Sequence, residues 1–282
     1  MADRSLRLKL AARVALFMVA SAAVLAFGAP IADKFPDFPA GLSIGVVTSV
    51  VTLGLTMLFV RWEGTDLESV GAVPSGNSPL RFAVGFLIGA ILVALHVSIE
   101  AFIGHVQWAR SENVGSRDTL TMLITYILLA SREELAFHGY PLRRLRSAFG
   151  MWPAQIAIAL VFAAEHAVGG VTWPHALFGA GVGSLLFGMA ALATRGLAVP
   201  IGIHAAWNLG DWMSGGKGPG GLWNPVGGYQ GHAERATTIG YVFVMLSATL
   251  CFWLWERREA PNATTATPDR TPDAADTRQA LR

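Results

Sequence analysis

The sequence predicts an all-α, polytopic membrane protein whose bundle contains about eight transmembrane helices. Hydrophobic residues make up 53% of the chain and charged residues only 14%, whereas soluble domains carry about 25% charged residues. The apolar residues form long blocks instead of short alternating runs, as in helices that cross a bilayer. Basic residues also concentrate in alternate connections between these blocks, which indicates a regular crossing of the membrane.

Eight apolar blocks follow one another, separated by connections rich in Gly, Pro, Asn, Asp and Ser. A spanning helix needs roughly 17–25 residues. The second, third, fourth, sixth and eighth blocks fit this length, whereas the first, fifth and seventh need flanking residues. The seventh is the least regular, because Pro200 and several polar residues interrupt it. In order, the blocks are Val14–Ala29, Gly41–Val60, Phe82–Ile103, Leu120–Phe137, Trp152–Val168, Ala176–Ala193, Leu197–Trp212 and Thr238–Trp255.

The blocks predict one transmembrane domain over residues 1–256, and the Ala-, Thr-, Pro- and Asp-rich residues 257–282 predict a disordered tail. Cleavage of the first block as a signal peptide after Ala29 is an alternative, but the further blocks favour a retained helix. If all eight helices span, most basic residues share one face with both termini, so the positive-inside rule places the termini in the cytoplasm. We expect the plasma (inner) membrane as the location. The net charge of +2 is too small to indicate nucleic-acid binding.

Ionisable side chains occur inside two consecutive helices of this pattern, where they are costly to bury. Glu133 and Glu134 follow the apolar run of the fourth block, and His166 lies one helical turn after Phe162 in the fifth. If the two helices form a hairpin that turns near Gly150, Glu133 and His166 each lie about 16 residues, or roughly 24 Å, from the turn. They are then at one height on neighbouring helices. Taken alone, the two carboxylates could equally be interfacial charges.

The seventh block supplies a third group of polar side chains. His204, Asn208 and Asp211 follow one another at helical spacing, so they share a face. His204 lies about nine residues, or roughly 13 Å, after Arg195 at the cytoplasmic side, which is near the middle of the bilayer. Hydrogen bonds between helices are the alternative explanation. Polar groups at one level on three helices favour a shared site.

Such a set of side chains can activate water. Apolar surroundings and a second carboxylate favour the protonated form of a carboxyl group, which makes it usable as a general base near neutral pH. Imidazole and amide groups can orient the water and donate hydrogen bonds to a developing oxyanion. This mechanism requires no cofactor. The alternative is a zinc ion held by Glu133, His166 and His204 with water in an open position, and the sequence is consistent with both.

Three motifs in this order resemble those of the CPBP family of CAAX proteases and bacteriocin-processing membrane proteins, also called the Abi or Rce1-like family. The resemblance implies an eight-helix intramembrane bundle in which Glu133 is the catalytic base, Glu134 supports it and His166 positions the water. It also implies that His204 and Asn208 form the oxyanion site. The motifs lie within residues 120–212 and read Glu133-Glu134-x-x-x-His138, Phe162-x-x-x-His166 and His204-x-x-x-Asn208.

One position departs from the family pattern. His138 stands where the family has Arg, and a His side chain is neither permanently charged nor bidentate. If the family Arg orients the second Glu, that support is weaker here. Arg132 and Arg143 are the nearby side chains that could compensate.

The function expected from these residues is that of an intramembrane endopeptidase acting on a membrane-tethered protein or peptide in the lipid bilayer. The substrate would be a CAAX tail or, in a prokaryote, a peptide or the terminus of a membrane protein. A non-catalytic scaffold or immunity protein is one alternative, favoured by His138. A transporter with a proton path along the polar helices is another. We expect His96 and Glu100 to pair with each other, and Glu165 to point away from the site.

Overall fold

A computed structural model describes residues 4–32, 39–217 and 220–264 of the chain. Helices account for most of these residues, and two π-helical turns, η1 and η2, interrupt the α-helices. The elements in chain order are α1 (Arg4–Ala32), α2 (Ala40–Trp62), α3 (Ser78–Phe102), β1 (Trp108–Arg110), α4 (Ser116–Glu133), η1 (Glu134–Gly139), α5 (Tyr140–Phe149), α6 (Met151–Val168), α7 (Trp173–His175), η2 (Ala176–Gly181), α8 (Val182–Ala193), α9 (Ala198–Met213), β2 (Trp223–Pro225) and α10 (His232–Thr264).

Each of the eight apolar blocks lies within a helical segment, to within one residue at its ends. The short strands β1 and β2 form a two-stranded antiparallel pair between the loop before α4 and the loop after α9. The predicted all-α membrane bundle is therefore confirmed.

Six helical segments among the described residues are long and apolar enough to cross a membrane, and they correspond to the first, second, third, fifth, sixth and eighth blocks. The prediction that the fourth block fits a span on its own needs correction. Helix α4 carries four charged side chains near its ends, at Arg117, Asp118, Arg132 and Glu133. Helix α9 has only 16 residues and is therefore too short to count as a membrane span on its own. These two helices hold His204 and Glu133, and in α4 the charge of Glu133 itself contributes to the weaker membrane signal.

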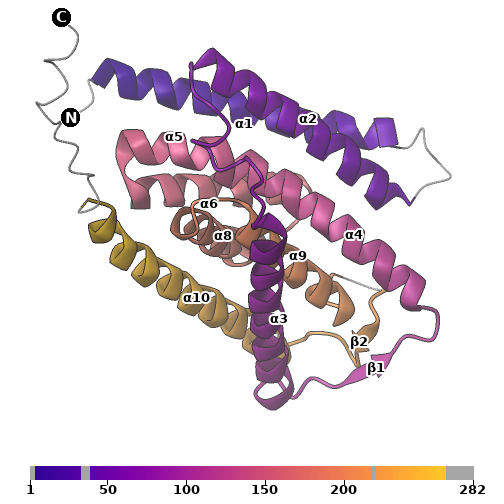
Figure 1. The fold of residues 1–282 in the computed structure, drawn as a ribbon. Helices are drawn as coiled ribbons and strands as arrows, with labels where there is room; N and C mark the ends of the chain where they lie inside the picture. The colour runs from indigo at the N-terminus through magenta and orange to yellow at the C-terminus, as the bar shows by residue number, and fades with distance from the viewer. Residues whose placement is uncertain (1–3, 33–38, 218–219, 265–282) are drawn as a thin grey trace, which may run out of the picture.

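The helices pack so that one of them is enclosed by the others. Helices α1 and α2 lie side by side along the top of the bundle and α10 runs along the bottom, with α6, α8 and α9 between them (Figure 1). In an 18-residue stretch of the apolar segment Trp173–Ala193, 67% of the residues are buried inside the protein. The corresponding stretches of the other five segments have only 17–33% of their residues buried. Helix α8 is therefore central, and the remaining spans present most of their apolar side chains to lipid.

Helices α3 and α9 pack with their backbones in close contact. A Cβ atom at Gly85 would overlap the carbonyl oxygen of Val199, and one at Gly202 would overlap the carbonyl oxygen of Phe82. Small residues at helix interfaces allow such close approach in membranes, where lipid supplies no hydrophobic force to bring helices together. This contact fixes the rotation of α9 and hence the face on which His204 lies.

The hairpin predicted between the fourth and fifth blocks is present. Helix α5 ends at Phe149, Gly150 adopts a φ of 89°, and α6 begins at Met151. Glycine adopts this left-handed conformation without steric cost. Helix α4 runs without a break through η1 and α5 to this turn, so the hairpin brings α6 back along the helix that carries Glu133.

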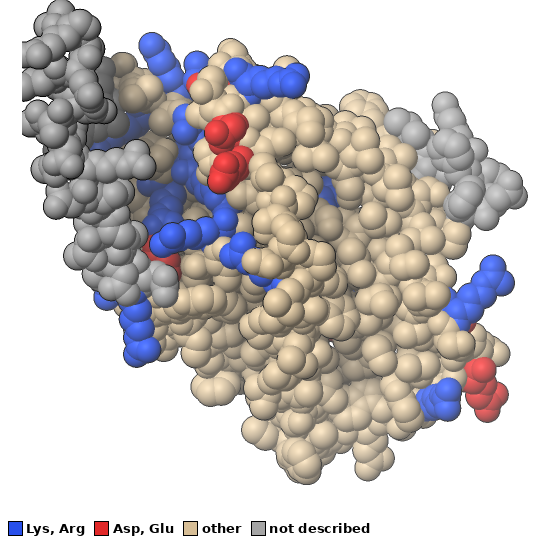
Figure 2. Space-filling model, viewed as in Figure 1, with Lys and Arg blue, Asp and Glu red and all other residues tan. Residues whose placement is uncertain are grey.

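Basic side chains gather at the end of the bundle where α1 begins and α10 ends (Figure 2). There the buried carboxylate of Glu63, just after α2, contacts Arg13 at 3.3 Å and Arg144 at 2.5 Å and accepts a hydrogen bond from the Tyr140 hydroxyl at 3.0 Å. These contacts tie α1, α2 and α5 together. The distribution agrees with the predicted sorting of charge between the two faces.

The C-terminal helix is longer than the sequence indicated. Helix α10 continues to Thr264, past Arg257, where we expected disorder to begin. The apolar span ends near Trp255, but Glu, Arg and Ala residues that follow it are good helix formers and extend the helix. The rest of the predicted tail, residues 265–282, lies outside the described residues.

Candidate functional site

The two adjacent glutamates lie where an α-helix changes to a π-helical turn. Glu133 is the last residue of α4 and Glu134 the first of η1. A π-turn holds one more residue than an α-turn, which rotates the side chains that follow, and such turns are frequent at functional sites. Both carboxylates can therefore reach the same interior region, although adjacent residues on a regular helix point about 100° apart.

Glu134 is completely buried and lies between two imidazoles. Its Oε2 atom is 2.8 Å from Nδ1 of His138, and its Oε1 atom is 2.9 Å from Nδ1 of His204. Each imidazole can donate its Nδ1 proton, so both carboxylate oxygens are satisfied in a place that excludes water. Two such donors compensate a buried carboxylate for the loss of its hydrogen bonds to water. Glu134 is thus suited to fixing the orientation of His204.

His138 receives its own support from the central helix. Its Nε2 atom is 3.0 Å from the hydroxyl oxygen of Ser184 on α8. If Nδ1 donates to Glu134, Nε2 can accept the serine proton, so a neutral His138 satisfies both contacts. The His that replaces the family Arg therefore does contact the second glutamate.

Neither arginine named as a compensating side chain contacts Glu134. Arg132 makes an ion pair with Glu165 on α6, with a distance of 2.6 Å between Nη1 and Oε1. Arg143 donates to the backbone carbonyl of His138 at 2.6 Å. Compensation by these two residues is therefore wrong, because both guanidinium groups are engaged elsewhere. The ion pair also explains why Glu165 takes no part in the site.

Glu133 is more accessible than Glu134. Its side chain is 19% exposed, and its Oε2 atom lies 3.4 Å from Nε2 of His204. The His204 ring therefore bridges the two carboxylates through its two nitrogens. An accessible carboxylate beside an imidazole is suited to exchanging a proton with water.

His166 lies across the site from this cluster. Its Nδ1 atom is 2.9 Å from the carbonyl oxygen of Phe162, and its ring packs on the Phe162 ring with centroids 4.5 Å apart. If Nδ1 donates to the carbonyl, Nε2 carries the free lone pair and can accept a proton. Within the described residues no ion pair joins His166 to Glu133. The imidazole that forms an ion pair with Glu133 is therefore that of His204.

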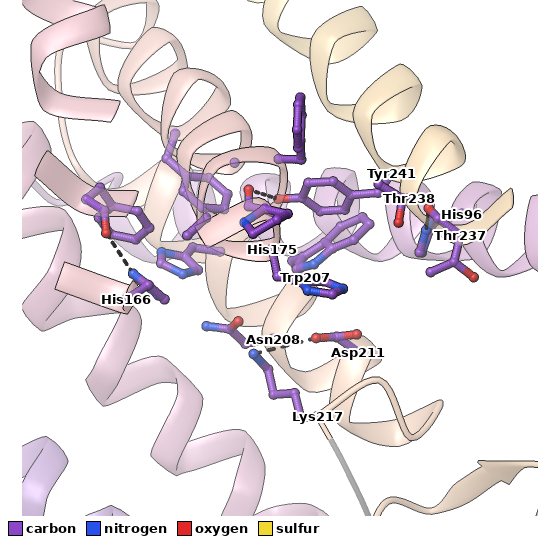
Figure 3. Close-up of a pocket in the computed structure, with 18 of the residues that line it drawn as sticks. His96, His166, His175, Trp207, Asn208, Asp211, Lys217, Thr237, Thr238 and Tyr241 are labelled. Atoms are coloured by element: carbon purple, nitrogen blue, oxygen red, sulfur yellow. Dashed lines mark hydrogen bonds and ion pairs between the residues drawn. The ribbon is translucent and has the colours of Figure 1, made fainter. Parts of the chain in front are cut away.

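A pocket of about 360 Å³ connects these side chains. His166, His204, Asn208 and Phe162 all line it, and Glu133 adjoins it through His204. The Asn208 amide makes no hydrogen bond to another residue in the described ranges, so its NH₂ group is free to donate. Figure 3 shows Asn208 beside Asp211 and Lys217, which form an ion pair at 3.6 Å, with His166 on the other side of the cavity.

The structure adds residues that the sequence had not placed in the site. Phe187 on α8 stacks on His204 with ring centroids 4.1 Å apart and an angle of 12°, and Ser184 holds His138. Both lie in the uniformly apolar helix α8, where no periodic pattern marks a functional face. A serine within such a helix is the only signal that could have drawn attention to this segment.

His96 and Glu100 contact a residue of α10 as well as each other. Their side chains approach only to 3.9 Å, while His96 contacts the Thr237 carbonyl oxygen at 3.0 Å and Glu100 accepts from the Thr237 hydroxyl at 3.0 Å. His96 also lines the pocket. The predicted pairing of His96 with Glu100 is therefore present at 3.9 Å, but the pair is not self-contained, because Thr237 of α10 makes the shorter contacts.

The zinc alternative requires three ligands that converge on one point. Both ring nitrogens of His204 are directed at carboxylates, and Nδ1 of His166 is directed at a backbone carbonyl. Over the described ranges, no three His, Cys, Asp or Glu side chains form a group that could hold a metal ion.

Fold and site together define a class: an integral membrane protein of packed helices with a buried glutamate–histidine cluster beside a polar pocket. Residues 115–210 match the family model described as type II CAAX prenyl endopeptidase Rce1-like, a protease family. The match covers roughly a third of the chain and contains all three motifs. It confirms the resemblance seen in the sequence. No curated protein matches the chain.

Proposed function

We propose that this protein is an intramembrane endopeptidase in which Glu133 activates the attacking water. The observation that carries the proposal is the row Glu133–His204–Glu134, held by two contacts of 3.4 and 2.9 Å. In this row the accessible carboxylate of Glu133 lies next to the imidazole of His204, and the buried carboxylate of Glu134 orients that imidazole. The Rce1-like match over the same residues supports a protease.

Each residue of the site has a separate role in the proposed reaction. Glu133 takes a proton from water as the water oxygen attacks the peptide carbonyl carbon. The free Asn208 amide donates a hydrogen bond to the resulting oxyanion, and His204, whose ring nitrogens face the two glutamates, keeps Glu133 in position. His166 orients the water through its Nε2 atom. When the carbon–nitrogen bond breaks, the proton held by Glu133 passes to the leaving amine, and Glu133 returns to its starting state.

The substrate in this proposal is tethered to the membrane. An apolar groove of about 630 Å³ runs along α10, lined by residues such as Phe243 and Leu246, and shares Phe178 and Thr238 with the polar pocket. An apolar anchor could lie in this groove while the adjoining peptide enters the pocket. CAAX-type tails and the termini of membrane proteins or peptides have this combination of an apolar anchor and a polar chain.

We further propose that both termini are cytoplasmic and that the plasma membrane is the location. Basic side chains gather at the end where α1 begins and α10 ends, and cytoplasmic ends of membrane proteins carry this excess (Figure 2).

The test is a cleavage assay on the full protein in proteoliposomes. Wild type, Glu133→Gln and the exposed control Glu112→Gln are compared on a prenylated CAAX peptide and on a membrane-anchored peptide without the prenyl group, each with and without a chelator. We expect Glu133→Gln to lower the rate by about 10²–10⁴-fold, because a general base contributes that much. Wild-type and control rates should be equal and unaffected by the chelator. Full activity of Glu133→Gln would end the proposal.

A non-catalytic scaffold is the second candidate function. The observation in its favour is that His138 stands where the family pattern has Arg. Since His138 contacts Glu134 at 2.8 Å and is itself held by Ser184, the departure from the family Arg leaves the second glutamate supported. An inert wild type on both peptides, with the fold intact, would favour the scaffold.

A further inference from the structure

A second cavity, of about 440 Å³, lies at the basic end of the bundle and is separate from the proposed active site. Arg143 and Arg146 of α5 line it together with Arg195, which follows α8, and Glu68, which follows α2. Figure 2 shows basic side chains around a recess at this end of the molecule. Three cations and one carboxylate thus face a common space.

Two of these cations lack a counter-charge. Arg146 pairs with Glu256 at 2.5 Å, but over the described ranges neither Arg143 nor Arg195 makes an ion pair. Arg143 is partly buried and donates only to the carbonyl oxygens of His138, at 2.6 Å, and Ala191, at 3.2 Å, among the described residues. Burial and the neighbouring charge of Arg146 lower the pKa of Arg143 to about 10. A buried cation without a partner charge is costly, so an anion in this cavity would stabilise the protein.

Arg195 occupies a backbone position that favours glycine. It has a φ of 53°, its N–H bonds to the Leu192 carbonyl, and the N–H of Gly196 bonds to the Ala191 carbonyl. This is a Schellman motif, in which the residue in the left-handed conformation is usually Gly. An arginine here is strained, yet the turn holds its side chain at the mouth of the cavity. A role of the guanidinium group in binding a ligand would explain why arginine, and not glycine, occupies this position.

Exposed tryptophans indicate that the cavity lies near the level of lipid headgroups. Trp152 and Trp255, both more than 40% exposed, lie close in sequence to Arg146 and to its partner Glu256, respectively. Exposed tryptophans at helix ends mark the interface between hydrocarbon and water. Basic pockets between helices at this level suit phosphate headgroups.

We propose that Arg143, Arg146 and Arg195 form a binding site for a phosphate group, supplied by the headgroup of an anionic phospholipid. Guanidinium groups match phosphate oxygens in geometry and charge. The site does not depend on the proposed peptidase activity. Through the hydrogen bond from Arg143 to the His138 carbonyl, an occupied site also steadies η1.

The test measures thermal unfolding of the full protein in detergent during titration with phosphatidylglycerol, phosphatidylcholine or inorganic phosphate. The wild type should show a saturable rise of Tm with phosphatidylglycerol that phosphatidylcholine does not match. In Arg195→Gly the apparent affinity should fall by about tenfold or more, as expected for loss of a charge-assisted hydrogen bond. This variant should nevertheless fold well, since glycine suits the turn, and Arg195→Lys should keep part of the response.

Arg117→Gln is the matched control, because Arg117 is exposed at the start of α4 and lies outside the cavity. It should respond as the wild type does. A response to inorganic phosphate at the same affinity as to phosphatidylglycerol, lost in Arg195→Gly, would assign the site to soluble phosphate and overturn the lipid source. An equal lipid response in wild type and Arg195→Gly, or none in the wild type, would overturn the site itself.

Discussion

The two glutamates should separate stability from catalysis when each is changed to glutamine. Glu134 is fully buried and accepts hydrogen bonds from two imidazoles at 2.8 and 2.9 Å. In Glu134→Gln, one oxygen becomes an NH₂ group that faces an imidazole N–H. One charge-assisted bond worth about 1.5–3 kcal/mol is lost, and a buried donor is left without an acceptor, which costs about 1–3 kcal/mol.

The expected loss for Glu134→Gln is therefore about 2.5–6 kcal/mol of unfolding free energy, or roughly 5–20 °C in Tm for a domain of this size. Glu133 is 19% exposed and makes one longer contact of 3.4 Å. Glu133→Gln should cost less than about 1 kcal/mol, as for partly exposed ion pairs, while it removes the catalytic base. Glu133→Gln should thus lose cleavage while it keeps its Tm, whereas Glu134→Gln should lose Tm.

Thermal unfolding in detergent, followed by the fluorescence of the nine tryptophans, measures the first effect, and peptide cleavage measures the second. Glu112→Gln serves as the control for both. A wild-type Tm for Glu134→Gln would refute the reasoning that Glu134 is held by two donors. An equal loss of Tm in Glu133→Gln would refute the assignment of Glu133 as the freer carboxylate.

Two further predictions concern His138 and the topology. His138→Arg, which introduces the residue of the family pattern, should lower Tm. His138 is fully buried against Phe162 and Phe187, and a larger side chain in a packed site costs about 1–3 kcal/mol. An unchanged Tm and a higher cleavage rate would contradict this. In a variant lacking Cys251, single cysteines at Glu68 and Glu112 should react with a membrane-impermeant thiol reagent from opposite sides of the membrane, and labelling from one side would contradict the proposed arrangement of loops.

The sequence by itself determined the class of fold, the eight helices and the hairpin at Gly150. These features depend on local properties: the length of apolar runs, the spacing of polar residues along a helix and the conformational freedom of glycine. The three motifs also indicated the segment that matches the protease family. Each of these signals can be read without knowing which helices are neighbours.

Only the tertiary structure decided which side chains touch. The close packing of α3 on α9 sets the face on which His204 lies, and the π-turn η1 rotates Glu134 toward His138 and His204. The sequence set Glu133 and His166 at one height on neighbouring helices and His204 near the same level, whereas only the structure shows that His204 lies 3.4 Å from Glu133. The support from Ser184 was equally hidden, because contacts across a bundle depend on the rotation and partners of each helix. Apolar patterning, which is nearly uniform around a membrane helix such as α8, does not record that rotation.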